Sequence, residues 1–462
     1  MKRKLVVILP RGEAIKNFVY SGISDALKEE YELVFFSVIP NAEIKTYLKG
    51  KCDYLYELDS ESKDKKYASE VKKCIQIAHA KNLNSVTGNL KLLKDDVDSK
   101  KNFLSSLLRK IRKKIAYNYA SDKKLKNLTS YYVRLQYKKN KVKYFEKLLN
   151  EIQPNLVFNG SHIHNYFSLD LLYACKKLNI KTAAFLFSWD NLTSQGRIIP
   201  TYDYYFTWNE KIKGDLLKYY PFLSNDVVFV TGSPQFDFHF IDDFIYTKEE
   251  LYDLLEIKYD KKIILYSTGM AYYTPKEDII VSELHERLKK IDPNLQLVVR
   301  IYAKDDNSVY YALRDQDSSL KIPDHYWELN HLTPTLKDIK LFTSLVKYSS
   351  IGINVASTVS LDLAIHNIPV LNIAFNPPNV DVYPNDYRKI YDFDHYKPIV
   401  ASGAVSLVYD LDDFEEQVKA YMKDPHKDEE ARKKLIHDFF GQSLEKDKKT
   451  VFLEVFNTIF RK

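Results

Sequence analysis

The chain has 462 residues, more than one ordinary hydrophobic core organises, so two or three domains are expected. A hydrophobic content of 45% and a charged content of 28% exclude a mainly disordered chain. The three scattered cysteines exclude a disulfide framework and a zinc site, and they favour a reducing, cytoplasmic compartment. Apolar stretches all fall short of the ~18–20 residues of a membrane span, so we expect a soluble or surface-attached protein.

The first sixty residues have the pattern of a parallel α/β domain. The continuous apolar run Lys4–Leu9 predicts a buried strand, and a helical pattern follows over Ala14–Leu27. Tyr31–Val38 predicts a second strand. A strand, a helix and another strand in this order are typical of the start of a doubly wound domain.

The segment from about 60 to 149 interrupts this pattern. It is rich in lysine and lacks strand signals, so we expect a helical insertion in the first domain. One part has the spacing of an amphipathic helix. Its apolar residues are Phe103, Leu104, Leu107, Leu108 and Ile111.

The same insertion concentrates the positive charge of the chain. Between Lys100 and Asn150 there are sixteen basic residues and two acidic ones, a local balance of +14 in a chain with a net charge of +7. Such a stretch attracts anionic surfaces, so we expect residues 100–150 to meet an anionic membrane surface. The alternative is a solvated helical face. We expect no nucleic-acid partner, because no nucleic-acid-binding motif is present.

The α/β pattern returns after the insertion. A helix is expected over Tyr166–Leu178, and a hinge between domains at Thr231-Gly232-Ser233-Pro234. Apolar runs predict further strands at Asn155–Asn159, Lys181–Phe187, Tyr204–Trp208 and Val227–Val230.

The second half repeats the pattern. Helices are expected over Asp278–Lys290 and Ser360–His366, and Lys446–Phe460 is an amphipathic helix that we expect to return to the first lobe. The predicted strands are Lys262–Tyr266, Leu295–Ile301, Ile351–Val355 and Ile368–Ile373.

These patterns predict an α/β protein of two facing Rossmann-like parallel-sheet domains. The first covers residues 1–232, with the insertion at about 60–149, and the second covers 233–437. Residues 438–462 hold the helix that crosses back. Open parallel sheets bind ligands outside the carboxyl ends of their strands, so we expect a cleft between the domains.

Candidate phosphate-binding residues follow the strands of the second domain. A turn of small residues after the first strand lets backbone N–H groups approach a phosphate, and hydroxyl residues begin the helix after Ile351–Val355. Ordinary turn formation and helix capping are the alternatives. Arg300 ends an apolar strand and suits phosphate neutralisation, or else a surface salt bridge. The candidates are Ser267, Thr268, Gly269, Arg300, Asn354, Ser357, Thr358, Ser360 and Asp362.

Candidate acceptor and catalytic residues follow the strands of the first domain. Trp189 can stack on a sugar ring, and Asp190 can act as a general base, unless it only caps a local turn. His162 is a second candidate base or phosphate donor; with His164 alone it lacks the ligands of a metal site. The expected acceptor-binding residues are Arg11, Gly12, Ser161, Trp189 and Asn191.

Several of these stretches, in this order, resemble GT-B-like proteins of bacterial capsule and lipopolysaccharide biosynthesis. This group is distantly similar to CDP-glycerol glycerophosphotransferases and UDP-N-acetylglucosamine 2-epimerases. The resemblance covers most of the chain except the basic insertion. The matching stretches are Ser188–Gly196, Thr231–Asp237, Asn354–Asp362 with Ile368-Pro369-Val370, and His395-Tyr396 with Pro398.

The resemblance implies a donor nucleotide on the second domain and an acceptor on the first. Relatives commonly continue the strand of Arg300 with His-Pro, whereas this chain continues to Lys304, which we expect to act as the cation instead. We therefore expect a glycosyltransferase of surface polysaccharide biosynthesis that uses a nucleotide sugar and a saccharide or lipid-linked acceptor. No metal or other cofactor is expected, because the Asp-x-Asp matches follow no convincing strand.

The same resemblance leaves other functions open. A CDP-glycerol-type enzyme would transfer a polyol phosphate, and a 2-epimerase would need no acceptor. A non-catalytic two-lobed scaffold for a partner synthase is the alternative outside enzymes. The expected location is the cytoplasm, at the inner face of the cell membrane.

Overall fold

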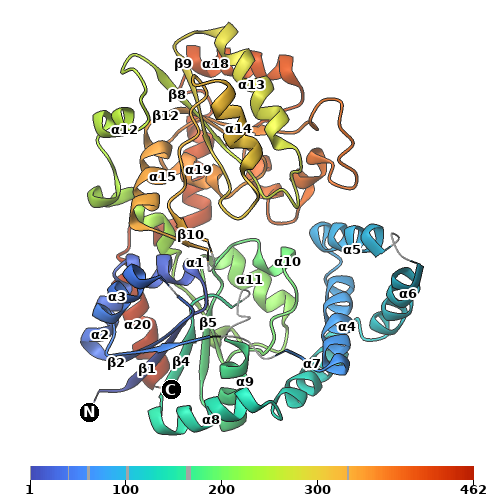
Figure 1. The fold of residues 1–462 in the computed structure, drawn as a ribbon. Helices are drawn as coiled ribbons and strands as arrows, with labels where there is room; N and C mark the ends of the chain where they lie inside the picture. Colours follow the sequence, from blue (N-terminus) through green and yellow to red (C-terminus); the bar gives the residue numbers. More distant parts are fainter. Residues whose placement is uncertain are drawn as a thin grey trace. The chain divides into compact units, whose positions relative to one another are not determined.

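The computed structural model describes residues 2–39, 41–59, 63–99, 103–162, 168–329 and 332–461. It forms two compact units: unit 1 is Met1–Gln235 with Gln442–Lys462, and unit 2 is Phe236–Gly441. Each unit is a parallel sheet covered by helices (Figure 1), which confirms the predicted fold class. The units divide after Gln235 and after Gly441, whereas the sequence prediction placed the divisions after residues 232 and 437.

The sheet of unit 1 has seven parallel strands in the order β3-β2-β1-β4-β5-β6-β7. Six of them match predicted strands. The sequence prediction missed β3, because this edge strand is half exposed and has no continuous apolar run. The strands are β1 Lys4–Leu9, β2 Glu32–Ser37, β3 Tyr54–Glu57, β4 Leu156–Asn159, β5 Thr182–Phe185, β6 Tyr204–Thr207 and β7 Val228–Val230.

The helix expected over Ala14–Leu27 is broken into three pieces, which corrects that prediction. A short helix α1 (Gly12–Ile15) passes into a π-helical turn η1 (Lys16–Tyr20) and then, after Gly22, into α2 (Ile23–Glu30). Gly22 has a φ of 78°, a left-handed conformation that glycine adopts without the strain of a side chain. The chain therefore changes direction at this glycine.

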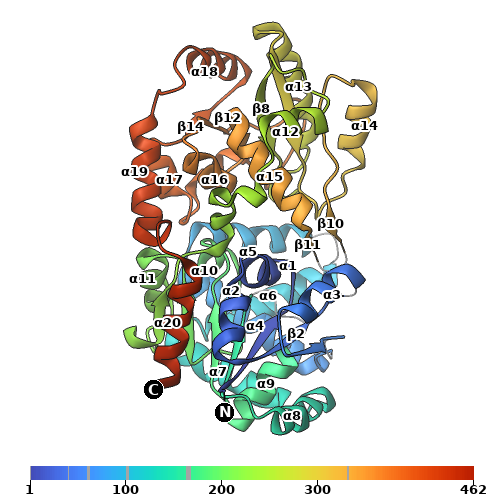
Figure 2. The same cartoon turned by 90° about the vertical axis from the view of Figure 1, so that its left-hand side faces the viewer.

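The C-terminal helix α20 (Lys448–Arg461) packs on the unit 1 sheet, beside α2 (Figure 2). Phe452 lies 5.4 Å from Phe18 and 5.6 Å from Phe206 between ring centroids, and Phe456 lies 5.2 Å from Phe158. Such aromatic contacts bury large apolar areas. The expected return of the C-terminal helix to the first lobe is confirmed.

The insertion is helical wherever the structure describes it, as predicted. Helix α4 packs against α5, α6 and α7, to one side of the sheet (Figure 1), and α8 packs against α9. The helices of unit 1 not yet given are α3 Ala42–Gly50, α4 Lys66–Leu83, α5 Val86–Ser99, α6 Phe103–Tyr117, α7 Asp122–Gln136, α8 Asn140–Ile152, α9 Leu169–Leu178, α10 Asn191–Ser194 and α11 Glu210–Tyr219, with a 3-10 turn at Asn225–Val227. Lys100, Lys101 and His164 lie outside the described residues.

The sheet of unit 2 has five parallel strands in the order β14-β13-β12-β8-β9. Four match predicted strands, and the short edge strand β14 was missed. The strands are β8 Lys262–Ser267, β9 Leu295–Arg300, β12 Ser349–Asn354, β13 Val370–Ile373 and β14 Ser406–Val408, and a hairpin adds β10 Trp327–Glu328 and β11 Thr333–Pro334.

Helices cover both faces of the unit 2 sheet. A single strand can contact helices on both faces, because neighbouring residues of a strand point to opposite faces. Tyr266 on β8 bonds to α13, whereas Arg300, paired in register with the next residue of β8, bonds to α15. The helices are α12 Lys248–Leu254, α13 Glu277–Ile291, α14 Ser308–Gln316, α15 Leu336–Tyr348, α16 Val359–Ile365, α17 Lys397–Ala401, α18 Leu411–Lys423 and α19 Glu429–Phe440, with 3-10 turns at Pro234–Phe240, Asp242–Phe244, Tyr387–Asp392 and Gly441–Ser443. None of the helices in the described residues has the length and apolarity that a membrane crossing needs.

Candidate functional site

A row of polar residues crosses the carboxyl edge of the unit 2 sheet. Ser267 on β8 is paired in register with Arg300 on β9 and with Asn354 on β12, and Asn354 is paired with Asn372 on β13. Residues in register on parallel strands point to the same face. The structure therefore brings together three of the predicted donor residues at the edge where open parallel sheets bind ligands.

Arg300 is held rigidly but is not fully bonded. Its Nη2 donates to Asp338 Oδ2 across 2.6 Å, and the side chain is only 10% exposed. Trp327 Nε1 donates to the same oxygen at 2.7 Å. Arg300 Nε and Nη1, and Ser267 Oγ, are buried without a hydrogen-bond partner in the described part of the chain. Unsatisfied buried donors are rare, so these atoms make Arg300 and Ser267 candidate ligand contacts.

The turn after β8 bonds to protein groups. Thr268 Oγ1 accepts from the backbone N–H of Tyr302 at 2.8 Å, and the N–H of Gly269 donates to Glu277 at 2.8 Å. Burial raises the pKa of Glu277 to about 7. The N–H of Gly269, expected for a phosphate, therefore faces a carboxyl group. Lys304 lies over the ring of Tyr302, 5.7 Å from its centroid.

Asn354 and Ser360 belong to a buried network. Asn354 Nδ2 donates to Ser360 Oγ at 3.1 Å, and the hydroxyl of Tyr396 donates to Asn372 Oδ1 at 2.7 Å and lies 2.8 Å from Ser360 Oγ. Both predicted residues have no exposed surface. This network fixes α16 to β12 and β13, which is a structural contribution to the edge.

The remaining candidates near α16 are also bonded locally. The N–H of Ser357 donates to Asn354 Oδ1 at 3.0 Å, and Thr358 precedes the first turn of α16. Asp362 Oδ1 accepts from His239 Nε2 at 2.8 Å, and His366 Nε2 lies 3.0 Å from His239 Nδ1. Burial lowers the pKa of His366 to about 4, so it stays neutral and can donate to His239.

In unit 1, His162 follows β4. Its Nδ1 lies 3.1 Å from the carbonyl oxygen of Phe185, which can only accept, so Nδ1 carries the hydrogen. The lone pair of neutral His162 is then on Nε2. The preceding Ser161 is fully buried. The chain passes close to α1 and η1 here, because a Cβ on Gly160 would lie 2.9 Å from Ala14 Cβ.

Asp190 is held by its own turn. Oδ1 accepts from the hydroxyl of Ser188, and Oδ2 accepts from that of Ser194 at 2.5 Å. Asn191 Oδ1 accepts from the N–H of Ser188 at 3.0 Å, and Trp189 is buried to 9% exposure. The local turn that was the structural alternative for Asp190 is therefore present.

Arg11 and Gly12 follow β1. Arg11 Nε lies 3.6 Å from Glu13 Oε2, and Gly12 is buried in the first turn of α1. The structure places neither among the residues that line the pocket described next.

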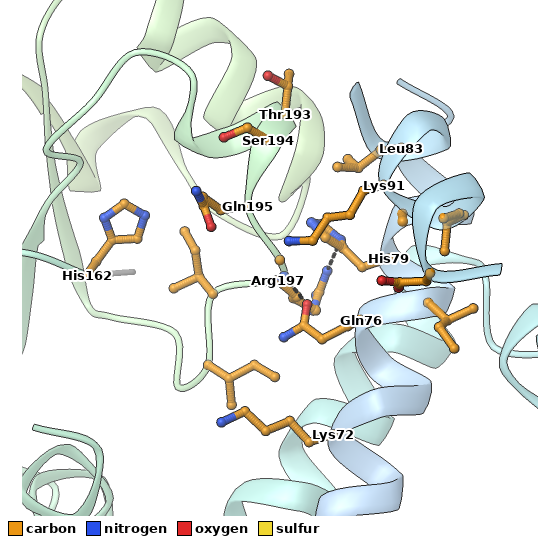
Figure 3. Close-up of a pocket in the computed structure, with 18 of the residues that line it drawn as sticks. Lys72, Gln76, His79, Leu83, Lys91, His162, Thr193, Ser194, Gln195 and Arg197 are labelled. Carbon is orange, nitrogen blue, oxygen red and sulfur yellow. Dashed lines mark hydrogen bonds between the residues drawn. The ribbon is translucent and has the colours of Figure 1, made fainter. Parts of the chain in front are cut away.

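Unit 1 contains a cavity of about 300 Å³ between the insertion and the turn after β5. Figure 3 shows His162 and Gln195 on the opposite side from Gln76 and His79. Lys72 and Lys91 add positive charge. The lining residues are Lys72, Gln76, Ile77, His79, Ala80 and Leu83 of α4, Gly88, Lys91, Leu92 and Asp95 of α5, Leu169 of α9, and His162, Thr193, Ser194, Gln195, Gly196, Arg197, Ile198 and Ile199.

Arg197 is a buried cation in the wall of this cavity. It is 4% exposed, Nε donates to Thr129 Oγ1 at 3.1 Å, and Nη1 lies 3.4 Å from His79 Nδ1. Burial and Arg197 lower the pKa of His79 to about 3, so His79 is neutral and accepts. The side-chain partners of Arg197 among the described residues are Thr129, His79 and the ring of Tyr220, none of which is a carboxylate. A buried guanidinium without a carboxylate suits an anionic ligand.

The sequence analysis missed most of this cavity. Of its lining, only His162 had been singled out as a site residue. In the sequence, Lys72 and Lys91 belong to the lysine-rich helical insertion. Only the fold brings them close to the turn after β5. The one available signal was Arg197 directly after the Ser188–Gly196 stretch.

No protein-family model matches the sequence, and no curated protein matches it. Solved structures do match over nearly the whole chain. The UDP-GlcNAc 2-epimerase from Neisseria meningitidis bound to UDP-GlcNAc has a TM-score of 0.55 at 14% identity, covering 99% of this chain and 100% of that chain. The UDP-GlcNAc 2-epimerase from Methanocaldococcus jannaschii has a TM-score of 0.50 at 13% identity, with 99% and 100% covered.

A glycosyltransferase from Rickettsia africae also matches, with a TM-score of 0.51 at 13% identity, covering 100% of this chain and 98% of that chain. Together these similarities show the GT-B-type fold of two Rossmann-like domains, and the resemblance found in the sequence is confirmed at this level.

Proposed function

We propose that the protein is a metal-independent glycosyltransferase that moves a sugar from a nucleotide sugar to a saccharide or lipid-linked acceptor in surface polysaccharide biosynthesis. The observation that carries the proposal is the set of buried polar atoms without partners on Arg300 and Ser267. They lie at the strand edge where parallel sheets bind ligands. The similar fold of nucleotide-sugar enzymes, one solved with UDP-GlcNAc, supports the same ligand class.

The donor phosphates are assigned to unit 2. Arg300 has Nε and Nη1 available while Nη2 donates to Asp338, so each of these two nitrogens can donate to a phosphate oxygen. The hydroxyl of Ser267, in register beside it, donates to the same group. Charge that develops on the departing phosphate is then stabilised by Arg300 and Lys304, as preorganised cations do.

The acceptor is assigned to the cavity of unit 1. Lys72, Lys91 and Arg197 outnumber Asp95 there, so the acceptor carries an anionic group such as a phosphate or carboxylate. His162 Nε2 takes the proton of the attacking hydroxyl, since Nδ1 already donates to Phe185. Asp190 accepts a hydrogen bond from Ser194, which lines the cavity. We therefore propose that Asp190 positions Ser194, and we test Asp190 as the alternative base.

The first experiment is a thermal-shift screen of the full-length protein with UDP-, GDP-, CMP- and CDP-linked donors. A ligand that binds the folded state raises the melting temperature by mass action. We expect one nucleotide class to do so, and a radiolabelled donor then to label a sugar-phosphate acceptor. A protein that no donor stabilises would be a scaffold and not a transferase.

A second candidate function is a nucleotide-sugar 2-epimerase, which the similarity to UDP-GlcNAc 2-epimerases favours. An epimerase converts its donor without an acceptor. Proton NMR of UDP-GlcNAc incubated with the protein alone separates the two: epimerisation in the absence of acceptor supports the epimerase. Transfer from CDP-glycerol in the same screen would instead indicate a polyol-phosphate transferase.

The proposal also includes a place of action. A lipid-linked acceptor requires the protein to work at the inner face of the cell membrane, although the described residues contain no membrane-spanning helix. Cell fractionation tests this: part of the protein should sediment with membranes at low salt and leave them at high salt.

A further inference from the structure

Helix α6 is amphipathic, and its basic side faces the protein. Arg109 is 9% exposed, with Nη2 3.2 Å from Asp95 and Nε 3.1 Å from Asp96 of α5. Lys113 bonds to Asp96 at 2.6 Å, and Arg112 reaches Glu70 of α4 at 2.8 Å. These ion pairs neutralise much of the positive charge of α6.

The opposite side of α6 is apolar and faces solvent. Its side chains are between 45% and 86% exposed, at positions that repeat every three or four residues on one face. Helices of globular proteins normally turn such a face inward. A contiguous exposed apolar surface marks a site of interaction. The residues of this outward face are Phe103, Leu104, Leu107, Leu108, Ile111 and Ile115.

The charged residues beside the outward face indicate what kind of surface binds to it. Lys110 and Lys114 are exposed and stand one turn apart along one edge of the face, and α6 contains no acidic residue. Long lysine side chains at the margin of an apolar face reach anionic headgroups while the apolar residues enter the acyl boundary. A protein partner would need an apolar groove bordered by acidic residues. An anionic bilayer matches the apolar residues with its acyl boundary and the lysines with its headgroups.

We propose that α6 lies flat on an anionic phospholipid bilayer through its outward face. The proposal deepens the proposed function and rests on it, since a lipid-linked acceptor gives such docking a purpose. Binding itself needs neither donor nor acceptor. The two proposals therefore fail separately: vesicle binding can be absent from an active transferase, and transfer can be absent from a vesicle-binding protein.

Vesicle flotation with the full-length protein tests the proposal. We expect co-flotation with vesicles of phosphatidylcholine containing about a third phosphatidylglycerol, and much less with phosphatidylcholine alone. The variant L107E/I111E should lose at least about ten-fold in partitioning. K110E/K114E should lose binding to the anionic vesicles and bind pure phosphatidylcholine as weakly as the wild type.

The matched control is L254E/V309E, which places the same charges at two apolar residues of unit 2 that are 41% and 44% exposed. It should float as the wild type does. All variants should unfold at the temperature of the wild type, because the changed side chains are exposed. Equal flotation of L107E/I111E and wild type overturns the proposal. So does a wild-type dimer in size-exclusion chromatography that L107E/I111E converts to a monomer without any vesicle binding, which would make the occupant a second copy.

Discussion

Ser267 and Arg300 occupy paired positions at the ends of β8 and β9, and both carry buried polar atoms that bond to no described residue. A buried hydroxyl without a partner contributes no hydrogen bond to the fold, so removing it from Ser267 should be harmless or stabilising. If the hydroxyl binds a ligand, its removal should instead weaken ligand binding. This difference gives the first prediction.

We predict that Ser267→Ala leaves the free energy of unfolding unchanged or raises it, and weakens donor binding about ten-fold or more. A lost hydrogen bond to a charged group costs about 1.5–3 kcal/mol. Isothermal titration with the nucleotide sugar found by the screen measures the affinity. Ser24→Ala is the matched control, because its hydroxyl is also buried without a partner but lies on α2, in unit 1. Unchanged affinity in Ser267→Ala would remove this serine from the donor site.

The ion pair between Arg300 and Asp338 is buried, with Asp338 only 2% exposed. We predict that Asp338→Ala lowers the free energy of unfolding of unit 2 by about 3–5 kcal/mol, because it leaves the guanidinium buried without its counter-charge. Asp412→Ala removes a carboxylate that is 92% exposed beside Arg287 and should change stability by less than about 1 kcal/mol. Urea unfolding followed by fluorescence compares them, and similar losses would contradict the prediction.

Glu277 makes the stability of unit 2 depend on pH. Burial raises its pKa from 4.5 to about 7, so the folded protein binds a proton that the unfolded chain has lost between those values. Stability from this group is therefore full below about pH 4.5 and falls by about 3 kcal/mol as the pH rises through 7.

We predict that Glu277→Gln loses less stability than the wild type between pH 5 and 8, because a neutral amide needs no proton. The amide can still meet Tyr266, Thr274 and the N–H of Gly269. Denaturant unfolding at several pH values measures the difference. Glu286→Gln, at a residue whose side chain is 57% exposed, should follow the wild type. Parallel curves for wild type and Glu277→Gln would contradict the assigned pKa.

His162 is the proposed base of the unit 1 cavity. We predict that His162→Gln lowers kcat by about 10²–10⁴ with little change in KM, because the acceptor hydroxyl keeps its binding contacts but loses its proton acceptor. His437→Gln, at an exposed histidine, is the control. Asp190→Asn should cost less than His162→Gln. The reverse order would make Asp190 the base.

Gly196 lines the cavity and lies directly against the side chain of Gln76. A Cβ there would lie 2.0 Å from Gln76 Oε1, which accepts from the N–H of Arg197 at 2.6 Å. We predict that Gly196→Ala displaces Gln76 and lowers the free energy of unfolding of unit 1 by about 1–3 kcal/mol, because the buried N–H of Arg197 loses its partner.

A double-mutant cycle checks this prediction. Gly196→Ala should cost much less in a Gln76→Ala background, because the clash and the hydrogen bond are then both absent. Gly214→Ala, at a helical glycine with nothing within 4 Å of the added Cβ, should be neutral or stabilising. Additive effects of Gly196→Ala and Gln76→Ala would mean that the two residues do not interact.

Sequence patterns predicted ten strands of the two parallel sheets and the return of the C-terminal helix. Buried parallel strands such as Lys4–Leu9 have continuous apolar runs, which can be read without any knowledge of their neighbours. The missed strands Tyr54–Glu57 and Ser406–Val408 are short edge strands that lack such runs. The break at Gly22 was missed because apolar spacing continues across it.

The candidate site was predicted less well than the fold. Arg300 and Ser267 were singled out as candidates, because polar residues at the ends of apolar strands stand out in the sequence. That the N–H of Gly269 bonds to Glu277, and Asp362 to His239, depends on residues distant in the chain. Such pairings leave no local pattern.

The sequence by itself determined the two α/β units, the helical insertion and the amphipathic character of Phe103–Tyr117, because periodicity and charge are local properties. Only the tertiary structure decided that this helix turns its basic side inward, and that Lys91 and Arg197 share one cavity with His162. The reason is physical: ion pairs and cavities form between residues that folding brings together, and the energy that orients them arises only at those contacts.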